Sequence, residues 1–256
     1  MTETPKNPAA PRAASTILLL RDGPKGLEVF MVVRHHEIDF ASGALVFPGG
    51  RMEAADVEFA REGAPFSDGL DETERALRIA AIREAFEECG VLLARPAGEV
   101  RFIPAERASA LDRSAPFAGL MAREGLLPAT DVLVPFARWI TPAFLPKRFD
   151  THFFLALAPH DHALAHDGRE TVDSVWIAPR DALEEKGERF KLLFPTERNL
   201  WKLTHHADAA SALAAARATP VVTVLPERIE VDGGPGLRIP LEAGFGGDAF
   251  SVRELR

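Results

Sequence analysis

The run Arg83–Val91 (REAFEECGV) constrains the fold and chemistry of this 256-residue chain more than any other segment. It predicts the end of a helix, because a glycine near its end is a common helix stop. At about 100° per residue, Glu84, Glu87 and Glu88 share one narrow face of that helix. Carboxylates this close repel each other. A hard divalent cation such as Mg²⁺ removes the repulsion by binding their oxygens, whereas the plainer alternative is a solvated acidic helix face.

A glycine turn upstream completes a known pattern. Phe47-Pro48-Gly49-Gly50 predicts a strand end followed by a tight turn. With Arg83–Val91 it resembles the Nudix box, G-x5-E-x7-R-E-U-x-E-E-x-G-U, where U is an apolar residue. That spacing places the arginine 14 positions after Gly50, at position 64, whereas Arg83 lies 19 residues later. The chain therefore resembles a Nudix hydrolase with an insertion between the glycine turn and the catalytic helix.

One position departs from the box. The residue eight positions before Arg83, where the family has its first glutamate, is Arg75. Glu72 and Glu74 are neighbouring carboxylates that could take over its role. In the family this glutamate is the partner of the box arginine, so the resemblance implies that Arg83 holds a carboxylate through its planar guanidinium and supports the helix rather than the substrate.

The resemblance implies a site that hydrolyses a diphosphate with the help of Mg²⁺ or Mn²⁺. Glu84, Glu87 and Glu88 are the proposed metal ligands, with the carbonyl of Gly50 or its neighbour completing the shell. Glycines in the turn allow close backbone approach. The predicted site comprises Arg83, Glu84, Glu87, Glu88 and Glu170 as catalytic residues and Arg34, Gly49, Gly50 and Arg51 as substrate contacts. Glu170 could equally be an exposed loop residue, and Arg34, Arg51 and Arg148 could be ordinary surface arginines.

Composition narrows the classes of partner. The net charge is −8, without a basic stripe with interleaved aromatic residues, which argues against nucleic-acid binding. The same acidity disfavours anionic membrane surfaces, and no apolar run approaches the roughly 20 residues needed to span a bilayer. The lone Cys89 fits a reducing cytoplasm and is expected to be a packing residue. Short histidine spacings at 160–166 could hold zinc, but thiolates are missing there.

Periodicity and turn residues predict a single domain over 15–256 after a flexible tail at 1–14. We expect Asp71 to cap the main helix, with Glu74 completing a capping box, and Gly90 to end it. Most of an insert at about 51–70 is expected to be loop, and a second insert at about 104–127 to be helical. Strands are predicted at 15–21, 27–34, 44–47, 136–140, 151–157 and 172–177, helices at 179–186 and 196–217, and a hairpin over 220–240.

A wider resemblance concerns the substrate. Val32–His36, Phe40–Gly50, Ala80–Glu84 and Arg148–Phe154 resemble the Nudix group that includes the acyl-CoA diphosphatases. This implies an α/β/α Nudix sandwich with a mixed sheet and added helices. The favoured activity is hydrolysis of CoA or acyl-CoA to adenosine 3′,5′-bisphosphate and a phosphopantetheine. The alternatives are another nucleoside diphosphate conjugate (ADP-ribose, NADH or a nucleotide sugar) or a non-catalytic binding module. Many Nudix proteins dimerise, so a homodimer is open.

Overall fold

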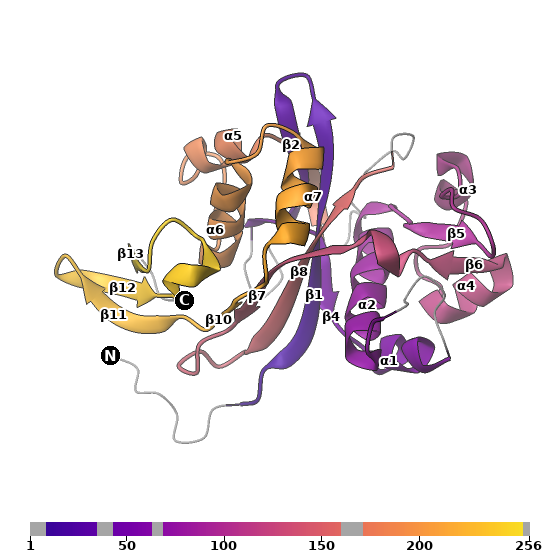
Figure 1. Cartoon of the computed structure of the whole chain (residues 1–256), viewed down its shortest axis with the longest axis horizontal. Coiled ribbons are helices and arrows are strands. Elements are labelled where there is room, and N and C mark those ends of the chain that lie inside the picture. Colours follow the sequence, from indigo (N-terminus) through magenta and orange to yellow (C-terminus); the bar gives the residue numbers. More distant parts are fainter. Residues whose placement is uncertain (1–8, 35–42, 63–68, 160–170, 253–256) are drawn as a thin grey trace.

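A mixed β-sheet forms the middle layer of the protein in a computed structural model that describes residues 9–34, 43–62, 69–159 and 171–252. Helices cover both faces of the sheet (Figure 1). Within the described residues the strand order is β10-β7-β8-β1-β2-β3, with β4 also pairing with β1 and β9 with β2. The β1–β8 and β7–β10 pairs are parallel and the other pairs antiparallel. The strands are β1 (Arg12–Gly23), β2 (Gly26–Arg34), β3 (Leu45–Val46), β4 (Gly49–Arg51), β7 (Val134–Ile140), β8 (Phe149–Leu157), β9 (Thr171–Ile177) and β10 (Thr223–Val224).

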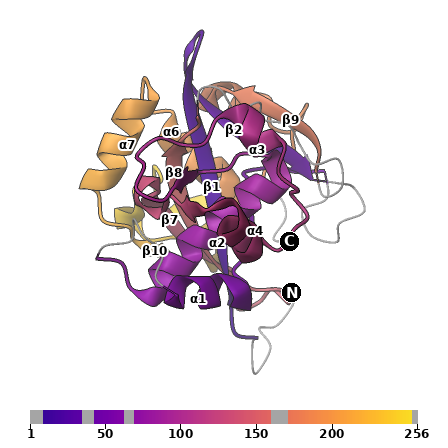
Figure 2. The same ribbon diagram turned by 90° about the vertical axis from the view of Figure 1, so that its right-hand side faces the viewer.

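The layer that carries the acidic helix packs on one face of this sheet. It contains α1 (Ala54–Arg61), α2 (Glu72–Cys89), α3 (Ala105–Ser109), α4 (Phe117–Glu124), the 3₁₀ turn η1 (Thr130–Val132) and a small ribbon of β5 (Ala94–Pro96) and β6 (Leu126–Pro128). Figure 2 shows α1, α2 and α4 from this side. Ile17 and Leu19 of β1 pack against Ile79, Ile82 and Phe86 of α2 in one core. The helix thus buries the apolar positions that its periodicity predicts.

The opposite face is covered by α5 (Pro179–Glu184), α6 (Phe194–Leu203) and α7 (Ala209–Ala218). Leu18 and Leu20 of β1 point into this second core, alternating with the residues of the first. A strand buried on both faces is apolar at consecutive positions, which explains the run Ile17–Leu20. A C-terminal ribbon of β11 (Glu227–Val231), β12 (Gly234–Arg238) and β13 (Ala249–Ser251), with η2 (Leu241–Ala243), completes the described fold. The predicted α/β/α arrangement with a mixed sheet and added helices is confirmed.

Local signals place the ends of α2 where the sequence predicts them. The Asp71 side chain accepts a hydrogen bond from the backbone N–H of Glu74 at 2.8 Å, which satisfies one of the free donors of the first turn. Gly90 ends the helix with φ of 73°, a left-handed conformation that costs glycine little. The two caps define an 18-residue helix.

Of three predictions of local structure, two were wrong and one is not tested. Strand β1 begins at Arg12, inside the predicted tail. The first insert holds the eight-residue helix α1, but positions 63–68 lie outside the described residues, so the expectation that most of this insert is loop stays a prediction. The predicted helix over 196–217 is two helices, because Asp208 starts α7 with a capping box to Ser211. In the described residues, no helix has the length and apolar character to cross a bilayer.

Candidate active site

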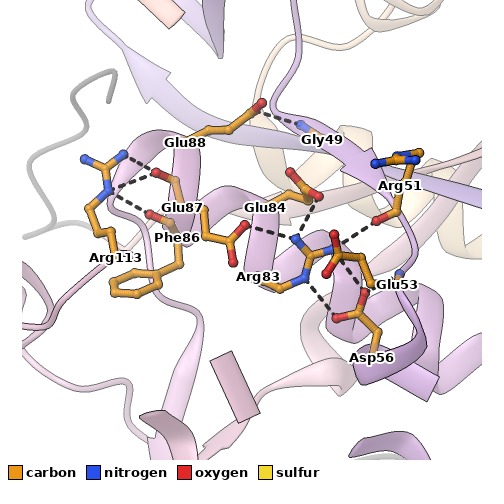
Figure 3. Close-up of polar contacts among 10 residues, drawn as sticks. All are labelled: Gly49, Arg51, Glu53, Asp56, Arg83, Glu84, Phe86, Glu87, Glu88 and Arg113. Carbon is orange, nitrogen blue, oxygen red and sulfur yellow. Dashed lines mark hydrogen bonds and ion pairs between the residues drawn. The ribbon is translucent and has the colours of Figure 1, made fainter. Parts of the chain in front are cut away.

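The glycine turn and the acidic helix meet at strand β4 (Figure 3). The backbone N–H of Gly49 donates a 3.0 Å hydrogen bond to Oε2 of Glu88. A Cβ atom at Gly50 would collide with the carboxylate of Glu84, and one at Gly49 would lie 2.7 Å from Cα of Thr16 on β1. Both glycines are therefore needed for close approach. The structure thus brings the glycine turn and the carboxylates together, and their metal and substrate roles stay predictions.

Arg83 lies at the centre of a buried carboxylate cluster. Its Nη1 donates to Oε1 of Glu84 at 2.8 Å and to Oε2 of Glu87 at 3.0 Å, and its Nη2 donates to the carbonyl of Arg51 at 2.9 Å. Its remaining donors face Asp56, with Nε to Oδ1 at 2.9 Å and Nη2 to Oδ2 at 3.0 Å. These five contacts use all five N–H donors of the guanidinium (Figure 3). The supporting role of Arg83 requires this arrangement and stays a prediction.

The structure places Asp56, and not a carboxylate near Arg75, beside Arg83. Counting back from Arg83 leads to Arg75, but counting forward from Gly50 by the box spacing leads to position 56. Asp56, on α1, is the partner of Arg83, and its side chain is only 2% exposed. Of the earlier candidates, Glu72 pairs with Arg61 and Glu74 lies in the first turn of α2. The insertion thus falls after this carboxylate and not before it.

The cluster carries an excess of negative charge. Asp56, Glu84 and Glu87 share the single guanidinium of Arg83, and Glu88 lies one residue further along the helix. Burial opposes the charge of Arg83, yet its hydrogen bonds to Asp56 and the nearby carboxylates raise its pKa above the usual value. Burial also raises the pKa of Glu87, although Arg83 acts against this. The chemistry of these hard oxygen donors fits a divalent cation.

Whether the carboxylates already form an assembled metal site is a separate question. Among the residues that the structure describes, no group of three His, Cys, Asp or Glu side chains is gathered closely enough to hold a metal ion. The Glu84 and Glu87 carboxylates face Arg83, and Glu88 faces the Gly49 N–H. A cation bound here would therefore take over some of these contacts. The donor types fit Mg²⁺ or Mn²⁺, and the ligand set remains a proposal.

Arg113 is a contributor that sequence reasoning missed. It lies between α3 and α4 in the second insert, and its Nε and Nη2 donate to the carbonyl of Glu87 at 3.0 and 2.6 Å. Nε also contacts the carbonyl of Phe86 at 3.0 Å. These carbonyls are among the last of α2, where helices lack internal partners and favour a cation. No local sequence signal identifies this contact, because it joins segments 26 residues apart.

The other predicted residues are less informative. Arg51 is exposed, and its backbone carbonyl rather than its guanidinium contacts Arg83. Arg148 donates to the carbonyls of Thr141 and Ala9. Cys89 is buried, as expected of a packing residue. Glu170, the histidines at 160–166 and the side chain of Arg34 lie outside the described part of the chain.

A mixed sheet between helical layers, with a carboxylate-bearing helix against a glycine turn, defines a Nudix domain. The chain belongs to the Nudix hydrolase family, matching the NUDT19 Nudix domain over residues 57–197. It is 29% identical over 222 residues to the acyl-coenzyme A diphosphatase NUDT19 of Gallus gallus, covering 66% of this chain and 57% of the relative. It is 31% identical over 209 residues to the human protein of the same name, covering 62% and 56% respectively.

A crystal structure supports the fold. A Nudix hydrolase from Alicyclobacillus acidocaldarius superimposes with a TM-score of 0.70 at 29% identity, covering 80% of this chain and 96% of that one. The chain spans little more than half the length of the curated relatives it matches. Family and fold are therefore established, whereas activity and substrate are inferences.

Proposed function

We propose that this protein is a Nudix pyrophosphohydrolase that cleaves a nucleoside diphosphate conjugate with Mg²⁺ or Mn²⁺, and that CoA or acyl-CoA is its favoured substrate. The observation that carries the proposal is the contact of Glu84 and Glu88 with the Gly49–Gly50 turn. It joins the two halves of the Nudix box in space despite the insertion between them. The names of the chicken and human relatives support the choice of acyl-CoA.

Each residue of the cluster has a distinct proposed role. Glu84, Glu87 and Glu88 would hold the cation, together with a carbonyl of the glycine turn. Arg83, fixed by Asp56, orients Glu84 and Glu87 through one nitrogen. The bare backbone at Gly49 and Gly50 lets β1 and the Glu84 carboxylate approach the turn closely, which keeps the proposed metal ligands beside its carbonyls. A cation held by these residues would neutralise charge on the diphosphate and lower the pKa of a bound water.

The site is tested by Glu88→Gln with Glu74→Gln as a matched control on the same helix. Glutamine keeps an oxygen that accepts from Gly49 but removes the negative charge, so the fold should survive. Because charge-assisted metal binding is lost, we expect turnover to fall by about 10²-fold or more in Glu88→Gln, and to remain near normal in Glu74→Gln, whose side chain is exposed. Near-normal turnover by Glu88→Gln would disprove the site.

The substrate is tested with a panel of CoA, acyl-CoAs, ADP-ribose and NADH, each with Mg²⁺, Mn²⁺ or a chelator. We expect metal-dependent release of adenosine 3′,5′-bisphosphate from the CoA compounds. Hydrolysis of ADP-ribose or NADH alone would show that CoA is not the substrate, while the proposed class of reaction would still hold. A lack of turnover with every compound would favour the non-catalytic binding module. Arg75 in place of the box glutamate would favour that module, but Asp56 supplies a carboxylate partner for Arg83.

A further inference from the structure

A groove of about 590 Å³ opens at the β10 end of the sheet, away from the carboxylate cluster. Its walls come from the residue before the cap of α2, from the segment around η1 and the start of β7, and from the end of α7. The lining residues are Leu70, Arg78, Asp131, Leu133, Val134, Pro135, Ala216, Arg217, Thr219, Pro220 and Val221. Most of these are apolar, and two are arginines.

Arg78 is the unusual member of this wall. It is 7% exposed, yet within the described residues no ion pair to a carboxylate is found for it. Its Nη1 donates to the carbonyls of Thr130 and Leu133, its guanidinium lies 5.3 Å from the ring centre of Phe154, and its buried Nε has no hydrogen-bond partner. Glu74 and Asp131 act on this charge through space but form no ion pair with it among the described residues, and a buried charge that is only partly compensated is costly. Burial accordingly lowers the pKa of Arg78.

The other charges in the groove leave the positive charge in excess. Asp131 is already neutralised by Arg95, whose Nη1 lies 3.1 and 3.0 Å from its two carboxylate oxygens. Arg217, in the last turn of α7, is exposed and adds a second guanidinium. At the C-terminal end of α7, Thr219 donates its hydroxyl to the carbonyl of Ala215 and its N–H to the carbonyl of Ala216. These two carbonyls therefore already have hydrogen-bond partners. The groove is thus mainly apolar and carries two guanidinium groups, one buried and one exposed.

We infer that this groove is a second binding site, for a small amphiphilic anion with a carboxylate or phosphate head at Arg78 and Arg217. Its apolar part would lie against Leu133, Pro135 and Pro220. Arg78 precedes Glu84 by six positions, which corresponds to about 9 Å along the helix and about 120° around it. The groove is therefore distinct from the catalytic site, and the inference does not rest on the proposed activity.

The test is a calorimetric titration of the whole protein with octanoate and with octyl phosphate, which separates the two head groups. Octanol and inorganic phosphate are the comparators, since the first lacks charge and the second lacks an apolar part. We expect at least one amphiphilic anion to bind about tenfold or more tightly than either comparator. Binding of octanol as tight as that of both anions, or binding of neither anion at millimolar concentration, would overturn the inference.

Variants assign the binding to this groove. Because a hydrogen bond to a charged group is lost, Arg217→Ala should weaken binding of the anion about tenfold, while keeping the fold, since its side chain is exposed. Arg123→Ala, an exposed arginine on α4, should leave the affinity unchanged. Glu88→Gln should also leave it unchanged, which separates this site from the catalytic one. Equal affinities in Arg217→Ala and the unchanged protein would refute the site, as would loss of binding in Glu88→Gln.

Discussion

Replacing Asp56 by alanine tests the central support of the catalytic helix. Asp56 and Arg83 have side chains that are 2% and 7% exposed, and they share two hydrogen bonds of 2.9 and 3.0 Å. Asp56 also accepts a 2.8 Å bond from the backbone N–H of Glu53 at the start of α1. The substitution therefore removes an ion pair and a helix-start contact together, and it leaves a buried guanidinium short of one carboxylate.

The magnitude follows from that burial. Breaking a buried ion pair by removing one partner typically costs about 3–5 kcal/mol. Glu84 and Glu87 continue to neutralise Arg83 in the variant, so we expect a loss at the lower end, about 3 kcal/mol of unfolding free energy. This is a large part of the about 5–15 kcal/mol typical of a folded domain. Catalytic turnover should fall by about 10–100-fold, because the side chains that orient metal ligands typically have effects of that size.

The control is Glu72→Ala. Glu72 was one of the two carboxylates that the sequence offered as the partner of Arg83, and it pairs instead with Arg61 on the surface, where the side chains are 44% and 62% exposed. Exposed pairs contribute little, so the expected cost is below about 1 kcal/mol. Urea unfolding at neutral pH measures both variants under the same conditions.

A double-mutant cycle separates the ion pair from other effects of the substitution. In an Arg83→Met background, Asp56→Ala should cost at least about 1.5 kcal/mol less than it does alone, because residues in one network are coupled by energies of this order. The reasoning fails if Glu72→Ala destabilises the protein as much as Asp56→Ala does. It also fails if the effects of Asp56→Ala and Arg83→Met are additive.

Further substitutions probe the surroundings of the cluster. Gly50→Ala should lower turnover about tenfold or more, because its Cβ displaces the Glu84 carboxylate, while the free energy of unfolding falls by less than about 1 kcal/mol. In Gly49→Ala the new Cβ meets backbone atoms, so the free energy of unfolding measured in urea should fall by about 1–3 kcal/mol. Arg113→Ala should cost about 1–2 kcal/mol, partly recovered by lysine at this position, since it caps helix carbonyls. The hydrogen bond from Arg138 lowers the pKa of Asp150. Arg138→Met should therefore destabilise the protein above the unfolded-state pKa of Asp, about 3.9, and the stability difference from the unchanged protein should vanish as the pH falls further. A stability difference that grew on acidification would contradict this.

Local patterns in the sequence were enough to predict much of the fold. Short apolar runs bounded by turn residues place β1, β2, β7, β8 and β9, and apolar spacing with a period of 3.6 places α2, because both signals depend on the order of residues along a single element. Asp71 and Gly90 define the ends of α2 for an equally local reason, since a cap satisfies backbone groups within its own turn. The acidic face and the glycine turn were also visible as separate signals.

The box spacing counted from Gly50 points to Asp56, but only the tertiary structure shows that Asp56 pairs with Arg83 and that Arg113 caps α2. Both contacts join residues 26 or 27 positions apart, and the length of the insertion hides which carboxylate faces the arginine. Likewise, the groove at Arg78 forms only where α2, β7 and α7 come together. Sequence determines which side chains can bind cations or anions. Which of them meet is decided by how the helices pack on the sheet, because those contacts arise between elements and leave no period along the chain.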